Sequence, residues 1–344
     1  MRKYARVTGI GMYAPERVMT NFELEKLMDT SDEWITTRTG IKRRHVAGDD
    51  EASSNLATKA SLRALEMAGL DPDDLDMIIN ATVTADKYFP ACGCMVQAAL
   101  GAHKAAAFDV NAGCSGFVYA LSIADQFIAS GTYKNILCIG VETLTHGFDW
   151  QDRNTNVLFG DGAGAAVLQA TDECTGPLSF VIGSDGSHGH YLSMSSLFGR
   201  PAEWPANGRP RAVFNGPEIF KFAVTTMGKV AKQAVDQAGL SLSDIDLFIP
   251  HQANLRIIQA ANKYLGMPAE KVFINVQEYG NTSAASIPIA LCEAVEQGLV
   301  HDGDKILMVA FGAGLSWGAT VVQWNPTPSK EPAGANQETY AIAR

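Results

Sequence analysis

The chain has 344 residues, of which 47% are hydrophobic and 19% charged, values typical of a globular protein with a sizeable buried core. Its 37 acidic residues outnumber its 27 basic ones and give a formal net charge of −10, which argues against bulk nucleic-acid binding. No apolar run approaches the roughly 20 residues that span a bilayer, and the six scattered cysteines do not resemble a disulfide framework. We therefore expect a cytoplasmic protein with reduced thiols that binds neither nucleic acid nor membrane.

The first part of the chain predicts strands that alternate with helices. The expected elements are a strand at 6–11 and helices at 20–28, 31–40 and 53–69, followed by a turn and a buried strand. Such alternation is typical of α/β proteins.

The stretch from Phe108 to Gly131 predicts a strand end followed by a buried helix. Small residues surround Cys114, which lies at the first turn of that helix. Unpaired backbone N–H groups and the helix dipole favour negative charge there, so we expect the Cys114 thiolate, the nucleophilic form, to be stabilised. For the stretch considered by itself, a small buried core cysteine is the alternative.

An internal duplication is indicated by two similar segments, AGLDPDDLD and AGLSLSDID. Gly69 and Gly239 lie 170 positions apart, and the same offset relates Asn111 to Asn281. We infer two related α/β halves, each with a mixed sheet, whose equivalent helix starts meet at a pseudo-twofold axis. The predicted units are an N-terminal half at 1–170, a C-terminal half at 171–324 and a flexible tail at 325–344. Residues 171–215, at the start of the second half, are expected to form surface loops.

The duplication brings two further residues toward Cys114. His251 follows a predicted buried strand, and Asn281 precedes a second helix start rich in small residues. Alone, they would be interpreted as a structural histidine and an N-cap. Together they form a Cys/His/Asn set that needs no metal: Cys114 attacks an acyl group, while His251 and Asn281 donate hydrogen bonds to developing negative charge.

Two glycine clusters, at 159–165 and 311–319, look like phosphate loops at first sight. Each is followed by a strand-like run instead of a helix, so a dinucleotide site is not expected. A close approach of the backbone to an oxyanion fits them better. Cys92 and Cys94 lack a second ligand pair at metal-binding spacing, so we predict no metal site.

At DVNAGCSGF, PHQANLRI and GNTSAAS the sequence closely resembles the beta-ketoacyl-acyl carrier protein synthase III family of the thiolase superfamily. The resemblance covers residues 4–324 and implies a duplicated five-layer αβαβα thiolase-like fold, a homodimer and an enzyme that starts fatty acid synthesis. Its implied partners are acyl-CoA and malonyl-acyl carrier protein, and it implies no cofactor.

The resemblance also implies roles for particular residues. Cys114 would be the acylated nucleophile, and His251 and Asn281 would complete the triad. The implied carrier-protein-binding segment is Gln252, Ala253, Asn254, Leu255 and Arg256. The positions that match coenzyme A contacts are Trp34, Arg38, Arg153 and Arg256. Phe89 matches a residue that reaches the acyl pocket of the partner subunit.

Two other functions remain open from the sequence. One is a related condensing enzyme with a specialised primer, and the other is a non-catalytic thiolase-fold scaffold. An intact Cys/His/Asn set argues against the scaffold.

Overall fold

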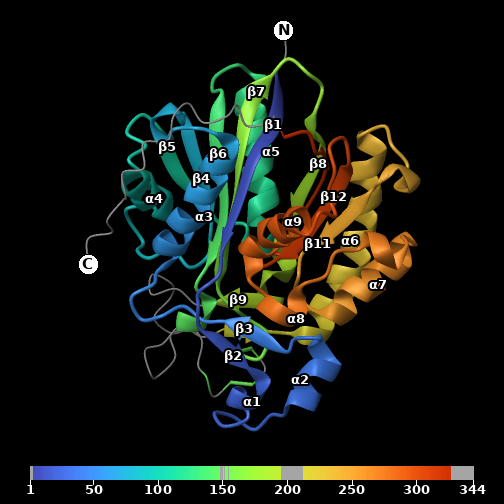
Figure 1. The fold of residues 1–344 in the computed structure, drawn as a ribbon. Coiled ribbons are helices and arrows are strands. Elements are labelled where there is room, and N and C mark those ends of the chain that lie inside the picture. The colour runs from blue at the N-terminus through green and yellow to red at the C-terminus, as the bar shows by residue number, and fades with distance from the viewer. Residues whose placement is uncertain (1–2, 148–149, 151, 154, 195–211, 327–344) are drawn as a thin grey trace.

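The structure, a computed structural model, describes residues 3–326 apart from 148–149, 151, 154 and 195–211. Two β-sheets lie side by side, with helices between them and over both outer faces (Figure 1). Among the described residues, no helix is long and apolar enough to cross a membrane. Residues 327–344 of the predicted tail lie outside the described part of the chain.

The first sheet has five strands in the order β1-β7-β6-β4-β5. Their bounds are β1 (Tyr4–Tyr13), β4 (Met77–Ala81), β5 (Ala106–Val110), β6 (Asn135–Glu142) and β7 (Gly162–Thr171). Strand β4 runs parallel to β5 and β6, whereas β7 is antiparallel to β1 and β6, so the sheet is mixed as predicted. Helices α3 (Ser53–Ala68) and α4 (Cys92–Leu100) pack their apolar residues on its outer face.

The second sheet has four strands in the order β11-β12-β13-β8. Their bounds are β8 (Gly176–Ser184), β11 (Leu247–Pro250), β12 (Lys305–Gly312) and β13 (Ser316–Gln323). Helices α6 (Gly216–Gln237) and α7 (Leu255–Leu265) cover the outer face with a second apolar cluster.

Between the sheets lie α5 (Gly116–Ala129) and α9 (Ser286–Glu296), and the largest apolar cluster joins them to the inner faces of both sheets. The sequence predicts this layer because both helices are apolar nearly all round, a pattern typical of buried helices. Backbones approach closely here: a Cβ on Gly140 would lie 2.3 Å from the carbonyl oxygen of Ala284. The five layers αβαβα confirm the predicted fold.

The duplication is visible in the elements themselves. The 3₁₀ turn η2 (Gly113–Ser115) and its counterpart η8 (Ser283–Ala285) lie 170 positions apart, as do η1 (Pro72–Asp74) and η6 (Leu242–Asp244). Each of the turns η2 and η8 leads directly into a central helix. The two helix starts are in contact, since a Cβ on Gly116 would lie 3.6 Å from that of Ala284.

The interval 171–215 differs from its prediction as surface loops. It contains β8, which pairs with β13 over its whole length and completes the second sheet. The sequence of β8, GPLSFVIGS, has polar and glycine residues that hide the strand pattern, while tertiary pairing to β13 supplies its hydrogen bonds. A turn, η4 (Gly186–Tyr191), and a small hairpin of β9 (Leu192–Met194) and β10 (Ala212–Phe214) follow.

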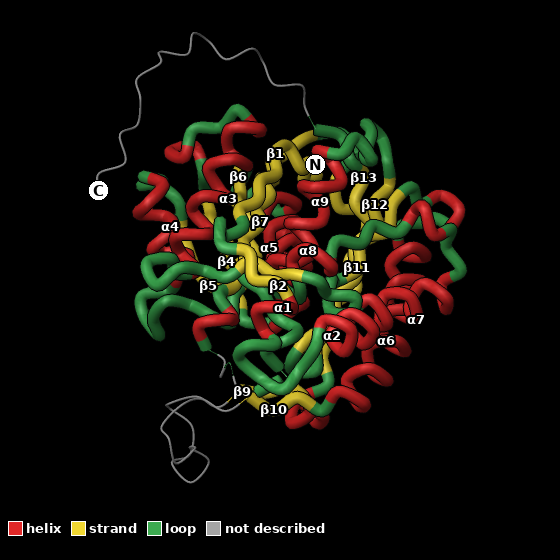
Figure 2. Tube along the Cα trace, turned by 60° about the horizontal axis from the view of Figure 1, so that its bottom comes forward, coloured by secondary structure: helices red, strands yellow, loops and turns green. Residues whose placement is uncertain are grey.

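A small cap lies over one end of the layers, and it comes forward in Figure 2. It consists of β2 (Val18–Thr20), α1 (Asn21–Leu24), α2 (Asp32–Thr39), β3 (Arg43–His45) and α8 (Val276–Tyr279). Arg44 is fully buried at its centre and donates hydrogen bonds to Asn21 Oδ1 at 2.8 Å and to the carbonyl of Val157 at 2.9 Å. The other 3₁₀ turns in the described part of the chain are η3 (Leu144–His146) and η7 (Ala269–Lys271).

Candidate active site

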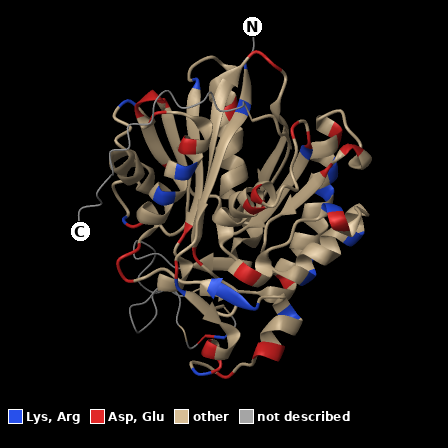
Figure 3. Ribbon diagram, viewed as in Figure 1, with Lys and Arg blue, Asp and Glu red and all other residues tan. Residues whose placement is uncertain are grey.

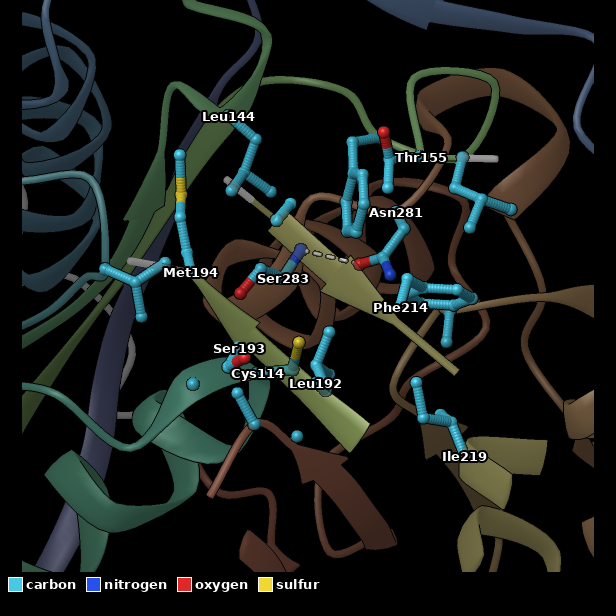
Figure 4. Close-up of a pocket in the computed structure, with 18 of the residues that line it drawn as sticks. Cys114, Leu144, Thr155, Leu192, Ser193, Met194, Phe214, Ile219, Asn281 and Ser283 are labelled. Carbon is cyan, nitrogen blue, oxygen red and sulfur yellow. Dashed lines mark hydrogen bonds between the residues drawn. The ribbon is translucent and has the colours of Figure 1, made fainter. Parts of the chain in front are cut away.

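One cavity of about 1720 Å³ contains the three residues that the sequence predicts as a catalytic set. Cys114 comes from η2, His251 from the end of β11, and Asn281 from the segment before η8. The cavity therefore draws residues from both halves of the duplicated chain. Figure 4 shows Cys114 and Asn281 on its wall, with Leu192, Phe214 and other side chains around them.

Cys114 is half-buried, and its backbone lies against the turn that follows β12. A Cβ on Gly312 would come within 2.5 Å of the Cys114 nitrogen, and one on Gly113 within 2.8 Å of the Ala313 nitrogen. Glycine is therefore required at both positions for this approach. The backbone of Cys114 therefore lies against that of Gly312 and Ala313, whose N–H groups are candidates for stabilising an oxyanion at the thiol.

The electrostatic setting of Cys114 differs from the prediction of a stabilised thiolate. Burial is the largest influence and raises the pKa of the Cys114 thiol to about 12. A hydrogen bond with Ser283 lowers that pKa, and the nearby charge of Glu142 raises it. Desolvation of the charged form thus outweighs the helix start, and the resting thiol is neutral.

His251 is held rigidly at the end of β11. Its backbone N–H donates to the carbonyl of Val309 at 2.7 Å, and its Nδ1 lies 2.6 Å from the hydroxyl oxygen of Ser286. Burial lowers the pKa of His251 to about 3, so the imidazole is neutral at physiological pH. With Nδ1 engaged by Ser286, Nε2 is the ring nitrogen left for a ligand.

Asn281 is fixed by both its backbone and its side chain. Its N–H donates to the carbonyl of Leu158 at 2.8 Å, and its carbonyl accepts the N–H of Gly160 at 3.1 Å. Its Oδ1 accepts the N–H of Ser283 at 2.9 Å, the dashed line in Figure 4. This bond leaves the Nδ2 donors of Asn281 for the cavity.

Near the mouth of the cavity, two arginines flank one tryptophan. The Arg38 guanidinium lies 4.5 Å from the Trp34 ring centre, and that of Arg153 lies 5.2 Å from it. Trp34, Arg38 and Arg256 line the cavity, whereas Arg153 is hydrogen-bonded to Asp29 beside it. An aromatic ring with nearby guanidinium groups can stack on a base and bind phosphate.

The segment expected to bind a carrier protein is only partly accessible. Gln252 and Ala253 are buried, and Gln252 bonds the backbone of Pro250, Phe273 and Asn275. Asn254 and Leu255 are half-buried, and Arg256 is exposed.

Phe89 lies outside the lining of this chain's cavity. Its side chain is 81% exposed, in the loop before α4. The structure of one chain therefore does not bring Phe89 together with Cys114.

Three polar residues around the site were not predicted from the sequence. Ser283 and Ser286 follow Asn281 in NTSAAS, and Glu142 ends β6. The two serines lie within a recognised motif but look like small helix-start residues. Glu142 has no local motif, and only its position at the end of an apolar strand could have indicated it.

The residues that the structure describes contain no cluster of three or more metal-ligating side chains. Both glycine clusters lead into strands, β7 and β13, as predicted. The geometry of a dinucleotide loop, which needs a helix at that point, is absent from these two segments.

The duplicated αβαβα fold, with Cys114, His251 and Asn281 on the wall of one cavity, defines a protein of the thiolase type. Sequence models described as 3-oxoacyl-[acyl-carrier-protein] synthase III and its C-terminal part match residues 108–186 and 235–324. A curated relative from Caldanaerobacter subterraneus, named beta-ketoacyl-[acyl-carrier-protein] synthase III, is 54% identical over 93% of this chain and 98% of its own length. The chain belongs to the 3-oxoacyl-[acyl-carrier-protein] synthase III family.

Solved structures agree with this assignment. The 3-oxoacyl-[acyl-carrier-protein] synthase III of Aquifex aeolicus is 49% identical, with a TM-score of 0.87 over 93% of this chain and all of its own. The priming beta-ketosynthase of the R1128 polyketide pathway is 40% identical, with a TM-score of 0.90 over 95% of this chain and 98% of its own.

Proposed function

We propose that this chain is a beta-ketoacyl-acyl carrier protein synthase III. It condenses an acyl-CoA primer with malonyl-acyl carrier protein and yields 3-oxoacyl-acyl carrier protein, CoA and carbon dioxide, the first elongation step of fatty acid synthesis. The observation that carries the proposal is the convergence of Cys114, His251 and Asn281 on one cavity. The family membership supplies the substrate class.

In the first half of the reaction, Cys114 attacks the thioester carbonyl of acyl-CoA and coenzyme A leaves. The backbone N–H groups at Cys114 and in the 312–314 turn stabilise the oxyanion, a contribution of about 3 kcal/mol for one donor. Trp34 and Arg38, with Arg153 and Arg256 nearby, bind the adenine and phosphates.

In the second half, the malonyl thioester oxygen accepts hydrogen bonds from His251 and Asn281. Both groups are neutral donors in a desolvated site, so they stabilise the enolate that forms when carbon dioxide leaves. The carbanion then attacks the acyl-Cys114 thioester. This order predicts ping-pong kinetics.

The carrier protein docks near the basic outer helices α6 and α7. Blue segments lie among red ones on the right-hand side in Figure 3, where Figure 1 places these helices, and α6 and α7 together contain five basic residues against Glu218 and Asp236. Their described residues include Lys221, Lys229, Lys232, Arg256 and Lys263. This local excess contrasts with the net charge of −10 and suits an acidic partner.

We also infer a cytoplasmic homodimer that needs no cofactor. The exposed Tyr88 and Phe89 form the kind of apolar surface that a second subunit covers. Light scattering of the purified protein tests the dimer.

The deciding experiment is mass spectrometry of Cys114 after incubation with acyl-CoA, followed by addition of malonyl-acyl carrier protein. We expect an acyl adduct on Cys114 that disappears as 3-oxoacyl product forms. Product formation by Cys114→Ala from acyl-CoA would contradict the assignment.

A specialised primer is the second candidate, because the R1128 priming beta-ketosynthase is similar over nearly the whole chain. A panel of acyl-CoAs with different lengths and branching, measured by the same Cys114 adduct, separates the two.

A further inference from the structure

Glu142, the last residue of β6, is a fully buried carboxylate beside the proposed nucleophile. It accepts hydrogen bonds from Thr84 Oγ1 at 2.6 Å, from the N–H of Val83 at 3.1 Å and from Ser283 Oγ at 3.1 Å. A weaker bond comes from Thr82 at 3.3 Å. All these donors are neutral, and among the described residues no basic side chain forms an ion pair with it. Burying a carboxylate without a counter-charge is costly, so such a residue is a candidate for function.

Ser283 connects this carboxylate to Cys114. Its hydroxyl donates to Glu142 Oε1 at 3.1 Å, and η8, which carries Ser283, packs against η2, which carries Cys114, on the wall of the same cavity. A hydroxyl has one proton to donate. When Glu142 is ionised, that proton points to the carboxylate, and the Ser283 oxygen can accept the S–H of Cys114.

The position of Ser283 is unusual. It is the one non-glycine residue with positive φ in the described chain, at 48°. Such a conformation is costly and is found where function requires it. Here it directs the Ser283 hydroxyl to Glu142 while the Ser283 N–H orients Asn281.

We propose that Cys114 and Glu142 share one proton through the hydroxyl of Ser283, and that Glu142 holds this proton while Cys114 attacks the acyl-CoA. In this step the S–H bond of Cys114 breaks and its proton passes to Ser283 Oγ. The original Ser283 proton passes to Glu142 Oε1. The sulfur forms a bond to the acyl carbon, and the sulfur of coenzyme A leaves with its electron pair and is protonated by solvent.

The physical advantage is conservation of buried charge. Losing the thiol proton to solvent would leave two negative charges, on Cys114 and Glu142, in one desolvated site. Transfer to Glu142 moves a single negative charge from the carboxylate to the sulfur. The Ser283 hydroxyl then donates to the thiolate and accepts from the neutral carboxyl group, so both hydrogen bonds survive the transfer.

The pKa shifts of Glu142 and Cys114 agree with the sharing of one proton between them. Burial raises the pKa of Glu142 to about 7, compared with about 12 for Cys114. Coupled groups titrate as a pair, so the pair holds one proton between these values. The loop after β4 presents hydroxyls of Thr82 and Thr84 to Glu142, η8 presents Ser283, and β7 presents the backbone of Gly162. The titratable group that faces Glu142 is Cys114 of η2.

The pH profile of Cys114 alkylation tests the proposal without any substrate. Iodoacetamide reacts with the thiolate, and peptide mass spectrometry separates Cys114 from the exposed Cys174. In the wild type, the rate constant should rise about tenfold per pH unit up to about pH 7 and then level off, because the shared proton fixes the thiolate fraction.

Glu142→Gln keeps the size of the side chain but cannot take up the proton. Its alkylation rate should equal the wild-type rate below about pH 6.5 and continue to rise about tenfold per unit above pH 7. At about pH 9 the variant should therefore react at least about tenfold faster than the wild type. A carboxylate with only a structural role would leave the two profiles parallel.

Two further variants complete the design. Ser283→Gly tolerates positive φ and keeps the N–H that donates to Asn281. Its Cys114 alkylation rate should level off at a lower value than that of the wild type, because the thiolate loses a hydrogen-bond donor. Asp161→Asn changes another buried carboxylate, bonded to Ala47 and Thr145 instead, and should keep the wild-type profile. Ser283→Gly also remains informative if Glu142→Gln fails to fold.

A wild-type rate that rises without levelling off would overturn the proposal, as would a levelling off in Glu142→Gln or an unchanged rate in Ser283→Gly. The role of the pair in acyl transfer rests on the proposed function, but separate experiments test proton sharing and acyl transfer. If the wild type shows the predicted alkylation profile but forms no acyl adduct, the proposed function is wrong and the proton-sharing pair stands.

Discussion

The hydroxyl oxygen of Ser286 lies 2.6 Å from Nδ1 of His251, and both side chains are buried. The same oxygen accepts the N–H of Gln252 at 3.4 Å. The Ser286 hydroxyl can donate its hydrogen to Nδ1, and in that arrangement the imidazole proton lies on Nε2 and the ring is a donor toward the cavity.

Removal of this hydroxyl should impair the His251 donor specifically. In Ser286→Ala we expect malonyl thioester decarboxylation to fall about tenfold to a hundredfold, the usual effect of losing a partner that orients a histidine. Acylation of Cys114 should change much less. The ¹⁵N shifts of the His251 ring report the tautomer directly, and Ser286→Thr, which keeps the hydroxyl, should restore it. An unchanged Nε2–H signal in Ser286→Ala would contradict this role.

His251 and Asn281 should act mainly in the second half of the reaction. Because both donate to the malonyl thioester oxygen, His251→Ala and Asn281→Ala should each reduce decarboxylation by about two orders of magnitude. Formation of the Cys114 adduct should fall far less. Measuring carbon dioxide release and the adduct on the same preparations checks this, and equal losses in both steps would exclude the division of roles.

Gly312 should be intolerant of any side chain. A Cβ there would lie 2.5 Å from the Cys114 nitrogen, so Gly312→Ala must displace a proposed oxyanion donor. We expect the condensation rate to fall about a hundredfold, equivalent to about 3 kcal/mol. Gly186→Ala is the control, since a Cβ at Gly186 meets no atom within 4 Å. Similar kinetics for the two variants would argue against an oxyanion site at this turn.

Arg256 should contribute to carrier binding through its charge. Arg256→Glu is expected to raise the KM for malonyl-acyl carrier protein at least about tenfold, an effect that added salt weakens. Lys104→Glu, which changes an exposed charge near α4 on the opposite outer layer, serves as the control. An unchanged KM in Arg256→Glu would place the carrier elsewhere.

The depressed pKa of His251 makes stability depend on pH. The unfolded chain binds a proton at His251 below about pH 6.5, while the folded chain binds it only near pH 3, so stability falls as pH drops through this window. Between about pH 8 and 5, the wild type should lose about 2 kcal/mol relative to His251→Gln. Urea unfolding measures the difference. His103→Gln, at an exposed site, should show no such divergence.

Much of the fold could be predicted because the duplication is recorded in residue spacing. The offset of 170 between Gly69 and Gly239 extends to the turns η2 and η8, so the spacing indicated that Cys114 in η2 and Asn281 just before η8 lie near each other in a candidate site. Strand β8 could not be predicted in the same way, since its residues acquire a strand pattern only when paired with β13.

The sequence predicted the candidate site residues that have distinctive chemistry of their own. It did not predict the residues that only position other side chains of the candidate site. Cys114 and His251 can act as a nucleophile and a hydrogen-bond donor, and their combination with Asn281 indicated a function, whereas Ser283 and Ser286 are ordinary at a helix start. Gln252 is a residue whose burial the motif did not indicate. It lies in a segment that was expected to bind a partner, but its side chain is buried and donates a hydrogen bond to the backbone. Side-chain burial depends on the whole fold and cannot be inferred from one motif.

The close contact between the two central helix starts has an evolutionary consequence. Gly140 of one half leaves no room for a side chain, because a Cβ there would lie 2.3 Å from the carbonyl oxygen of Ala284 in the other half. A smaller side chain at position 284 cannot relieve this clash, because the obstructing atoms belong to the backbone. Hybrid chains that combine the first half of one homologue with the second half of another should therefore fold only when glycine occupies the position of Gly140, so this position had to stay constant while the rest of the two halves diverged.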